Sequence, residues 1–461
     1  MTYRARSTFV PRSDVPGIVW PAIPAPHAAS MLALQYQLQQ SEWWPTPRIE
    51  AQQHVQLAQI LRHARDTVPF YQRRLRDSGF DPDSAVTPQS LRRIPLLSRR
   101  DVQLACGELE SLRPPAEHGA LIYGQTSGST GTPVRFKGTE LTQFMWNVFT
   151  LREVLWHRRD LAAKYAVIRM AVQEVVQPGW STATEMAFRT GPAAFLPIDA
   201  ELSRQVEWLE AQQPAYLLTY ASNLHALALY CLERGTAMPF LREVGSLGEV
   251  VTDEIRRDCE RAWNVPLVDM YTAQEVGYIA LQCPGYEHYH VQSENVLVEI
   301  LREDGEPCAP GEVGKVIATT LHNFAMPFIR YDIGDYAEVG EACPCGRGLP
   351  VLKRIFGRVR NMLTLPNGEQ RWPQVGCRGY GEPWLIRQFQ FTQRSLEAIE
   401  VRLVTGRPLT AHEESGLRQH ILDSLGHPFR LELVYCDAIE RSAGGKFEDF
   451  RSEITSAPVS A

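Results

Sequence analysis

The order of apolar and polar positions predicts a helical beginning and then alternating strands and helices. One apolar face with helical spacing contains Val55, Ala58, Leu61 and Ala64, and residues 139–157 read as a helix that carries aromatic side chains. From residue 164 onward, helical segments alternate with the short apolar runs KYAVIRM, AYLLTY, LREVGSLGEVV and VPLVDMY. This alternation indicates parallel strands with right-handed crossovers, in which ligands bind beyond the carboxyl ends of the strands.

Residues that commonly begin and end helices support this division. Ser222 is placed to begin a helix that ends at Gly235, and Thr252 precedes a helix whose first turn carries Asp253 and Glu254. Hydroxyl side chains cap helix N-termini, glycine favours the C-terminal turn, and acidic residues in the first turn complement the helix dipole.

The pattern changes after about residue 290. The segments NVLVEIL, GKVIATTL and DYAEV are short strands separated by glycine-containing turns, which is typical of antiparallel sheet. Beyond about residue 360, IRQFQF, AIEVRLV and FRLELVY read as strands and TAHEESGLRQHILDSL as a helix. We therefore expect an α/β fold. Residues 1–357 would form a large domain with parallel sheets and a β-rich subdomain, and residues 358–461 a small α+β domain.

Composition excludes several classes of protein. The 461 residues are 44% hydrophobic and 22% charged, which is typical of a globular protein. Lys and Arg number 47 against 53 Asp and Glu, a net charge of −6 that disfavours nucleic acid as a partner. Without an apolar run of membrane-spanning length or an apolar signal region, we expect no membrane association and a cytoplasmic location. The nine cysteines are scattered, which argues against a disulfide framework and makes any local cluster a metal candidate.

The stretch YGQTSGSTGTPVRFKG, residues 123–138, has the composition of a phosphate-binding loop. Glycines let the backbone approach a ligand closely, and N–H groups and hydroxyls suit phosphate oxygens. The spacing fits neither a Walker A loop nor a Gly-x-Ser-x-Gly nucleophile elbow. The candidate ligands are Thr126, Ser127, Gly128, Ser129, Thr130, Gly131 and Thr132. By their position after strands, residues 246–249 and 271–277 are further candidates for ligand contact.

These motifs occur in an order that resembles the AMP-forming adenylate-forming enzymes, specifically the phenylacetate–CoA ligase family and its capsule-biosynthesis-like relatives. The resemblance extends from about residue 35 to 450. It includes HARDTVPFYQRRL, QTSGSTGTP, GEVV, YTAQEVG, GEVGKVIATTL, IRYDIGD, CPCGR, GRVRNML and GGKF. It implies that residues 1–357 form an AMP-binding adenylation domain and residues 358–461 a mobile lid that carries the catalytic lysine.

The resemblance also implies roles for individual residues. The loop would hold the β- and γ-phosphates of ATP, Gly248 and Glu249 would flank adenine, Tyr271 and Thr272 would contact the nucleotide, and Glu275 would position Mg²⁺. Asp335 would accept hydrogen bonds from the ribose hydroxyls, with Asp332 as the competing candidate, and Arg358 would contact the nucleotide near the domain joint. Lys446 would reach the substrate carboxylate and the α-phosphate, where negative charge develops.

The sequence departs from the wider superfamily at one position and from the family pattern at three. Val134 stands close to the place where the wider superfamily often has lysine, so another cation must neutralise the phosphates. Gln274 replaces a common Ser or Thr, and Arg360 and Asn361 replace acidic residues at the hinge.

The candidates for contact with the acid are Tyr220, Ala221, Ser222 and Gln274.

A cysteine-rich turn predicts a structural zinc site. Cys283, Cys343 and Cys345 with His290 would give three thiolates and one imidazole, and the family resemblance favours His290 over His288. Cys308 is a spare candidate ligand. A four-ligand site leaves no open position, so the zinc would have no catalytic role.

We therefore expect an enzyme that uses ATP and Mg²⁺ to convert a carboxylic acid, aromatic by resemblance, to an acyl-adenylate. CoA is the expected acceptor, and an amine or a carrier protein is the alternative. A degenerate nucleotide-binding protein and a scaffold protein are the rival classes, and retention of Glu275, Asp335, Arg358 and Lys446 argues against the first. A monomer or homodimer is expected.

Overall fold

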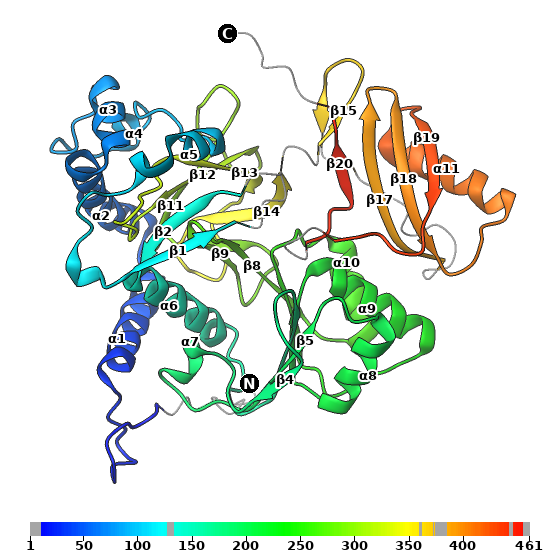
Figure 1. Ribbon diagram of the computed structural model, residues 1–461, viewed down its shortest axis with the longest axis horizontal. Coiled ribbons are helices and arrows are strands. Elements are labelled where there is room, and N and C mark those ends of the chain that lie inside the picture. Colours follow the sequence, from blue (N-terminus) through cyan, green and yellow to red (C-terminus); the bar gives the residue numbers. More distant parts are fainter. Residues whose placement is uncertain are drawn as a thin grey trace. The chain divides into compact units, whose positions relative to one another are not determined.

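The computed structural model describes residues 11–126, 133–358, 362–371, 373, 385–441 and 446–454, and the chain divides into two compact units (Figure 1). Unit 1 takes in residues up to Tyr165, Val175–Ala194 and Val268–Ile355. Unit 2 takes in Ala166–Glu174, Phe195–Leu267 and the chain from Phe356 onward. The last change of unit lies next to the expected joint at 357/358. Because unit 2 also contains residues 195–267, the expected two-domain division stays a prediction.

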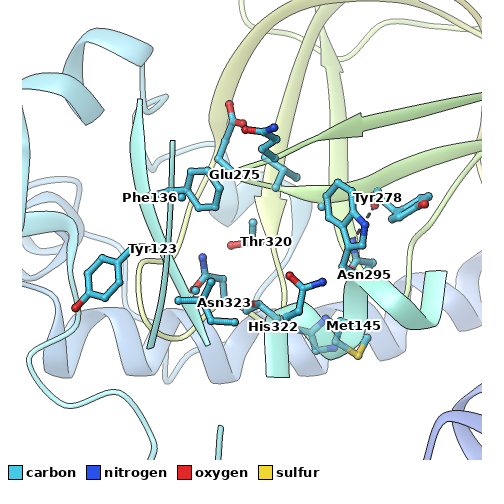
Figure 2. Close-up of a pocket in the computed structure, with 18 of the residues that line it drawn as sticks. Tyr123, Phe136, Met145, Glu275, Tyr278, Asn295, Thr320, His322 and Asn323 are labelled. Carbon is cyan, nitrogen blue, oxygen red and sulfur yellow. Dashed lines mark hydrogen bonds between the residues drawn. The ribbon is translucent and has the colours of Figure 1, made fainter. Parts of the chain in front are cut away.

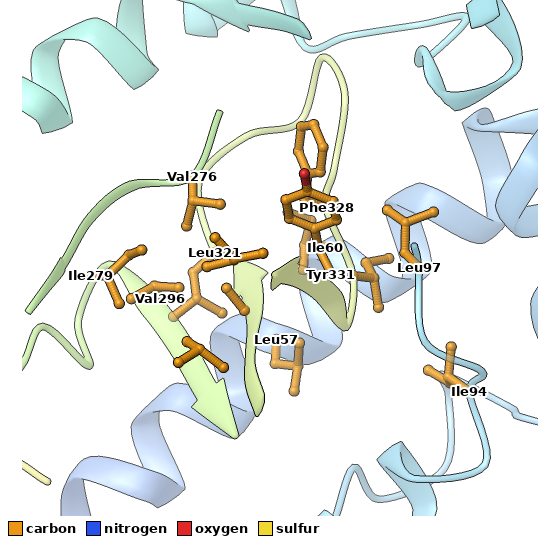
Figure 3. Close-up of a cluster of buried hydrophobic side chains, with 14 of the residues drawn as sticks. Leu57, Ile60, Ile94, Leu97, Val276, Ile279, Val296, Leu321, Phe328 and Tyr331 are labelled. Carbon is orange, nitrogen blue, oxygen red and sulfur yellow. The ribbon is translucent and has the colours of Figure 1, made fainter. Parts of the chain in front are cut away.

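Unit 1 begins with helices that cover a buried apolar core. Its helices are α1 (Pro26–Ser41), α2 (Thr46–Thr67), α3 (Pro69–Asp77), α4 (Pro88–Leu91), α5 (Arg99–Ala105), α6 (Glu140–Trp156) and α7 (Thr182–Glu185), with short 3-10 turns at Cys106–Leu109 and Ala116–His118. Leu57 and Ile60 of α2 pack in one cluster with Phe328 and Tyr331 (Figure 3). The expected face of α2 was wrong at Val55, which is 60% exposed. The buried stripe instead runs through Leu57, Ile60, Leu61 and Ala64, whose spacing is equally helical.

The strands of unit 1 form mostly antiparallel sheet. They are β1 (Leu121–Gln125), β2 (Arg135–Thr139), β4 (Val175–Gln177), β8 (Leu267–Ala273), β9 (Gly277–Gln282), β10 (Tyr289–Val291), β11 (Val296–Leu301), β12 (Val313–Thr320), β13 (Tyr331–Val339) and β14 (Val351–Arg358). Seven of them lie in the order β11-β12-β13-β14-β10-β9-β8. The antiparallel pairing of β11, β12 and β13 confirms the expectation for this section. A separate hairpin pairs β1 with β2.

Unit 2 contains the alternating strands and helices. Its first part comprises β3 (Tyr165–Arg169), β5 (Ala193–Pro197), α8 (Leu202–Gln212), β6 (Tyr216–Thr219), α9 (Ala221–Arg234), β7 (Glu243–Leu247) and α10 (Asp253–Trp263). β6 and β7 are parallel, as the alternation predicts. Gly235 ends α9 with φ +64°, and Thr252 caps α10 by accepting from the Ile255 N–H. The expected cap at Ser222 was wrong, because α9 begins one residue earlier, after Tyr220, and the Ser222 N–H is already bonded to a side chain.

The rest of unit 2 is a sheet with one helix. Its elements are β15 (Leu363–Thr364), β16 (Gln370–Arg371), β17 (Ile386–Ser395), β18 (Ala398–Thr405), α11 (Ala411–Leu425), β19 (Arg430–Tyr435) and β20 (Phe450–Ser452), with the sheet order β19-β18-β17-β20. α11 packs on this sheet through Leu417, Ile421 and Leu425, which share a core with Phe391 (Figure 1). This confirms the strands and helix expected here. In the described part of the chain, no helix is long and apolar enough to cross a membrane.

Candidate active site and metal centre

The two ends of the glycine-rich loop are joined by hydrogen bonds. Ser127, Gly128, Ser129, Thr130, Gly131 and Thr132 lie outside the described residues. At the loop base, Thr126 N–H donates to the Val134 carbonyl at 2.9 Å, and Val134 N–H donates to Thr126 Oγ1 at 3.0 Å. Arg99 Nη2 reaches the same Oγ1 at 3.4 Å. The hairpin therefore fixes both ends of the loop, with a guanidinium beside them.

A cavity of about 360 Å³ lies beside Glu275 in unit 1. Figure 2 shows Tyr123 and Phe136 of the hairpin on one side and Tyr278 on the other. Gln274 also lines the cavity, and Trp146 of α6 packs against Tyr278 with ring centroids 5.1 Å apart. The expected acid-contacting Gln274 and the expected metal-positioning Glu275 thus line one cavity, whose walls combine aromatic rings with amide and hydroxyl side chains.

Glu275 is held in a tight turn between β8 and β9. It is 8% exposed and accepts from the Tyr331 hydroxyl at 3.4 Å. The turn ends at Gly277, whose φ of +100° disfavours any residue with a side chain, and an added Cβ would lie 3.2 Å from Asn295 Nδ2. The backbone therefore fixes where this carboxylate stands, as a ligand for a hard cation requires.

Asp335 and Tyr271 meet within the same unit. The Tyr271 hydroxyl donates to Asp335 Oδ2 at 2.8 Å. Thr272 lies next to Tyr271 on β8, opposite Tyr278 of β9. The competing carboxylate, Asp332, accepts instead from the Gly334 N–H at 2.9 Å, and burial raises its pKa. Asp332 thus bonds to the backbone of its own strand, while Asp335 is oriented by a tyrosine.

In unit 2, Lys446 lies over Gly248. Gly248 follows β7 with φ +72°, and a Cβ added there would be 3.2 Å from Lys446 Cε and 3.6 Å from Nζ. The bare glycine thus leaves the space that the lysine side chain occupies. Arg358 ends β14 in this unit, directly after Gly357, and Arg360 and Asn361 lie outside the described residues.

Glu249 makes internal contacts that the sequence did not indicate. Its Oε2 accepts from the Ser222 N–H at 2.8 Å, and its Oε1 accepts from the Phe447 N–H at 2.5 Å. Arg441 Nη1 lies 3.4 Å from Oε1 and donates to Ser222 Oγ at 2.8 Å. Burial raises the pKa of Glu249 and lowers the pKa of Arg441, because both charges are removed from water.

Two of the residues expected to contact the acid are buried: Tyr220 is 5% exposed and Ala221 is 1% exposed.

The cysteine cluster in unit 1 brings together all the expected metal ligands. Cys283 Sγ and Cys343 Sγ are 3.8 Å apart, and Cys345 Sγ lies 3.4 Å from His290 Nε2. Donor atoms of Cys283, His288, His290 and Cys343 lie within 4.8 Å of one another. Cys308 packs elsewhere, against Gly314 of β12.

These distances fit a tetrahedral zinc site. Zinc–sulfur bonds of ~2.3 Å and zinc–nitrogen bonds of ~2.0 Å place two thiolates ~3.8 Å apart and a thiolate and an imidazole ~3.5 Å apart. His290 Nδ1 faces the Leu349 carbonyl at 3.4 Å, and a carbonyl only accepts, so Nδ1 carries the proton and Nε2 is left for the metal. His288 Nε2 is 2.9 Å from Cys343 Sγ, closer than two ligands of one zinc ion would be, which favours His290.

Arg347 connects the metal cluster to the protein core. Its guanidinium lies 4.7 Å from the Trp43 ring centroid and 4.6 Å from that of Trp156. Burial opposes ionisation of the Cys345 thiol, but hydrogen bonds from the Arg347 backbone and side chain lower its pKa below the usual value. A lowered thiol pKa favours the thiolate, the form that binds metal, whereas burial raises the pKa of the neighbouring Cys283 and Cys343 thiols.

The sequence did not single out two cations that the structure brings to these sites. Arg99 lies in SRRDV, a segment without a recognisable motif, and only the long-range contact with Thr126 reveals it. Arg441 precedes the GGKF motif, and its nearness to Lys446 in the chain was the only available signal.

Comparison with known proteins gives a consistent set of relatives. No model of a known protein family matches the chain. Phenylacetate-coenzyme A ligase of Thermus thermophilus is 26% identical over 442 residues, which cover 88% of this chain and 96% of the relative. The Escherichia coli enzyme of the same name is 27% identical over 86% of this chain and 93% of its own. Protein CapK of Staphylococcus aureus is 25% identical over 35% of each chain.

Solved structures share the fold. 2-Hydroxyisobutyryl-CoA ligase in its postadenylation state, in complex with an acyl-AMP, superimposes with a TM-score of 0.72 at 18% identity, over 90% of this chain and 92% of the other. The anthranilate CoA ligase AuaEII, in complex with anthranoyl-AMP, gives a TM-score of 0.53 at 15% identity, over 71% and 64%. These comparisons show that the chain is similar over most of its length to phenylacetate-coenzyme A ligases and shares the fold of the solved CoA ligases.

Proposed function

We propose that the protein activates an aromatic carboxylic acid with ATP and Mg²⁺ and transfers the acyl group to CoA. A carboxylate oxygen attacks the α-phosphorus, the bond to the β-phosphate oxygen breaks, and acyl-AMP and pyrophosphate form. The CoA thiol then attacks the acyl carbon, and AMP leaves. The observation that carries this proposal is Lys446 lying over Gly248 directly after β7, the strand end at which ligands of such sheets bind.

Each site residue would have a separate role in the first half-reaction. We assign the Lys446 ammonium to the negative charge that develops at the α-phosphate, where a preorganised cation lowers the barrier. Glu275 would hold Mg²⁺ through a carboxylate fixed by its turn, and Asp335, oriented by Tyr271, would accept from the ribose hydroxyls. Arg358 would contact the nucleotide. Arg99, at the base of the glycine-rich loop, would supply the phosphate-neutralising cation that Val134 does not.

Two observations support the finer assignment of substrates. The sequence relatives are phenylacetate-coenzyme A ligases, and the cavity beside Glu275 contains aromatic rings among uncharged polar side chains. Flat aromatic acids gain both apolar burial and ring contacts in such a space. We therefore favour aromatic over aliphatic acids as substrates, and CoA over an amine or a carrier protein as the acceptor.

We also propose a structural zinc ion held by Cys283, His290, Cys343 and Cys345. The distances between these donors and the tautomer imposed by the Leu349 carbonyl support the assignment. Four protein ligands fill the tetrahedral sphere, so the ion would join the segments around residues 283 and 343 and take no part in the reaction.

The test is an acid-dependent pyrophosphate-exchange screen over matched aromatic and aliphatic acids. Exchange with an aromatic acid, followed by thioester formation when CoA is added, is the expected result. Exchange followed by amide formation with added amines, but no thioester, would overturn the acceptor. ATP binding without exchange for any acid would overturn the activity and favour a degenerate nucleotide-binding protein.

A further inference from the structure

The buried Glu249 carboxylate contacts residues on both sides of Lys446 in the sequence. Phe447, the residue directly after Lys446, donates its backbone N–H to Glu249 Oε1 at 2.5 Å. Arg441, which precedes Lys446, lies 3.4 Å from the same oxygen. Glu249 therefore binds the lysine-bearing segment on both flanks, while Gly248 beside it lies under the lysine side chain.

The anchor of this arrangement is the first turn of α9. Ser222 donates its N–H to Glu249 Oε2 at 2.8 Å and accepts from Arg441 Nη1 at 2.8 Å through its hydroxyl. The Arg441 guanidinium also lies 5.9 Å from the ring centroids of Tyr220 and Phe447. The side chains of Glu249 and Arg441 are only 5% and 20% exposed. A buried carboxylate and guanidinium each need a partner, because an unpaired buried charge is costly.

We propose that Glu249 and Arg441 form a clasp that positions Lys446 for adenylation and is needed in that half-reaction alone. The inference rests on the role proposed for Lys446. Neither clasp residue needs to touch the reacting atoms, so both are positioning residues. A preorganised cation acts only when its geometry is fixed, and loss of the clasp would let the lysine segment leave Gly248. The second half-reaction would not need the clasp, because the α-phosphate bond has already been made.

The clasp has a readout that does not depend on activity. The Phe447 amide is protected by its bond to a buried carboxylate, so hydrogen exchange in the peptide that contains it should be slow in the wild type. Glu249→Ala should speed exchange in this peptide, while α11 peptides remain as protected as in the wild type. Unchanged protection would show that the bond to Glu249 does not hold this segment in solution.

The kinetic test measures adenylation in Glu249→Ala and Arg441→Ala, and the second half-reaction in Arg441→Ala. We expect pyrophosphate exchange to fall at least 10-fold in both variants. Thioester formation from supplied acyl-AMP and CoA should stay within twofold of the wild type in Arg441→Ala, which a merely unfolded variant could not show. Arg441→Lys should recover part of the exchange rate, since it keeps a cation facing Glu249.

The outcomes distinguish failure of the clasp from failure of the proposed function. If both alanine variants exchange pyrophosphate at the wild-type rate, the clasp is overturned and the proposed function is left intact. An equal loss in both half-reactions of Arg441→Ala would also overturn it, because the effect would then be general. Absence of exchange in the wild type with every acid would overturn the proposed function, and the hydrogen-exchange experiment would still decide whether Glu249 holds the segment.

Discussion

The Tyr271 hydroxyl donates to Asp335 Oδ2 at 2.8 Å, and this bond joins β8 to β13 within unit 1. A hydrogen bond to a charged group contributes ~1.5–3 kcal/mol, equivalent to ~10–100-fold in an equilibrium constant. The tyrosine thus fixes one oxygen of the carboxylate to which we assign the ribose.

Loss of this bond should weaken nucleotide binding. We expect Tyr271→Phe to raise the KM for ATP ~2–10-fold, and Asp335→Ala to raise it ~10–100-fold because the acceptor itself is lost. Steady-state kinetics with varied ATP would measure both effects. Tyr336→Phe is the matched control. Tyr336 follows Asp335 on β13, but its hydroxyl donates to Glu303. Equal effects at Tyr271 and Tyr336 would contradict the ribose assignment.

Removal of the Lys446 cation should abolish acid activation. We expect Lys446→Ala to lower acid-dependent pyrophosphate exchange ~10²–10³-fold, the usual cost of losing one preorganised charge-stabilising group. The fold should be retained, as judged by an unchanged melting temperature. Lys353→Ala is the control, because Lys353 pairs with Glu338 in unit 1. An unchanged exchange rate in Lys446→Ala would remove this residue from the mechanism.

Arg99 should matter for the phosphates of ATP. We expect Arg99→Ala to raise the KM for ATP about tenfold, because a cation near the phosphates would be lost, and Arg99→Lys to lie between it and the wild type. The neighbouring Arg100, which is exposed, provides a matched control as Arg100→Ala. If the two alanine variants behave alike, the neutralising cation must be sought elsewhere.

The proposed zinc site predicts a stoichiometric zinc content. Purified protein should contain about one zinc ion per chain by elemental analysis, in keeping with a closed four-ligand site. Cys343→Ser should lose the metal and lower the melting temperature, whereas Cys308→Ser should keep it because Cys308 packs against Gly314. Less than about half an equivalent in the wild type would count against the site.

The N-terminus of α11 predicts a stability change in acid. Hydrogen bonds from Arg407, at 2.6 and 2.9 Å, and from the Thr410 N–H lower the pKa of Glu413 from 4.5 to about 2. Because the folded-state pKa is the lower one, the stabilisation is present above pH 4.5 and is lost as the pH falls toward about 2. The melting temperature of Glu413→Gln should therefore lie below that of the wild type at pH 7. The two melting temperatures should converge as the pH falls from 4.5 toward about 2. A constant gap across this range, or an equal gap for the exposed Glu432→Gln, would contradict the prediction.

Local signals in the sequence were sufficient for most elements of unit 2. The N-cap Thr252 and the C-terminal Gly235 act through bonds and backbone angles within a few residues, so their effect can be read from the sequence. The buried stripe of α2 was harder to place, because Val55 and Leu57 are equally apolar and only the packed core decides which one is covered.

Contacts between distant segments were beyond the sequence. The family motifs indicated Glu249 and Lys446 separately, but nothing local shows that the Glu249 carboxylate binds the segment around Lys446. The same is true of Arg99, whose guanidinium reaches Thr126 across 27 residues of the chain. The candidate metal ligands were chosen because cysteines in turns have few other reasons to cluster, and the family resemblance favoured His290 over His288, but the zinc ion itself stays a prediction.

The bare backbone at Gly248 also limits how this protein can be redesigned. Libraries that aim to change the accepted acid commonly vary residues next to a substrate, and position 248 would be a natural choice. Its φ of +72° strains any residue other than glycine, and even a methyl group there would lie 3.2 Å from Lys446 Cε. A larger side chain at this position would therefore press on the end of the Lys446 side chain, to which we assign the α-phosphate, so an engineer should leave Gly248 fixed and vary the residues that line the cavity beside Glu275.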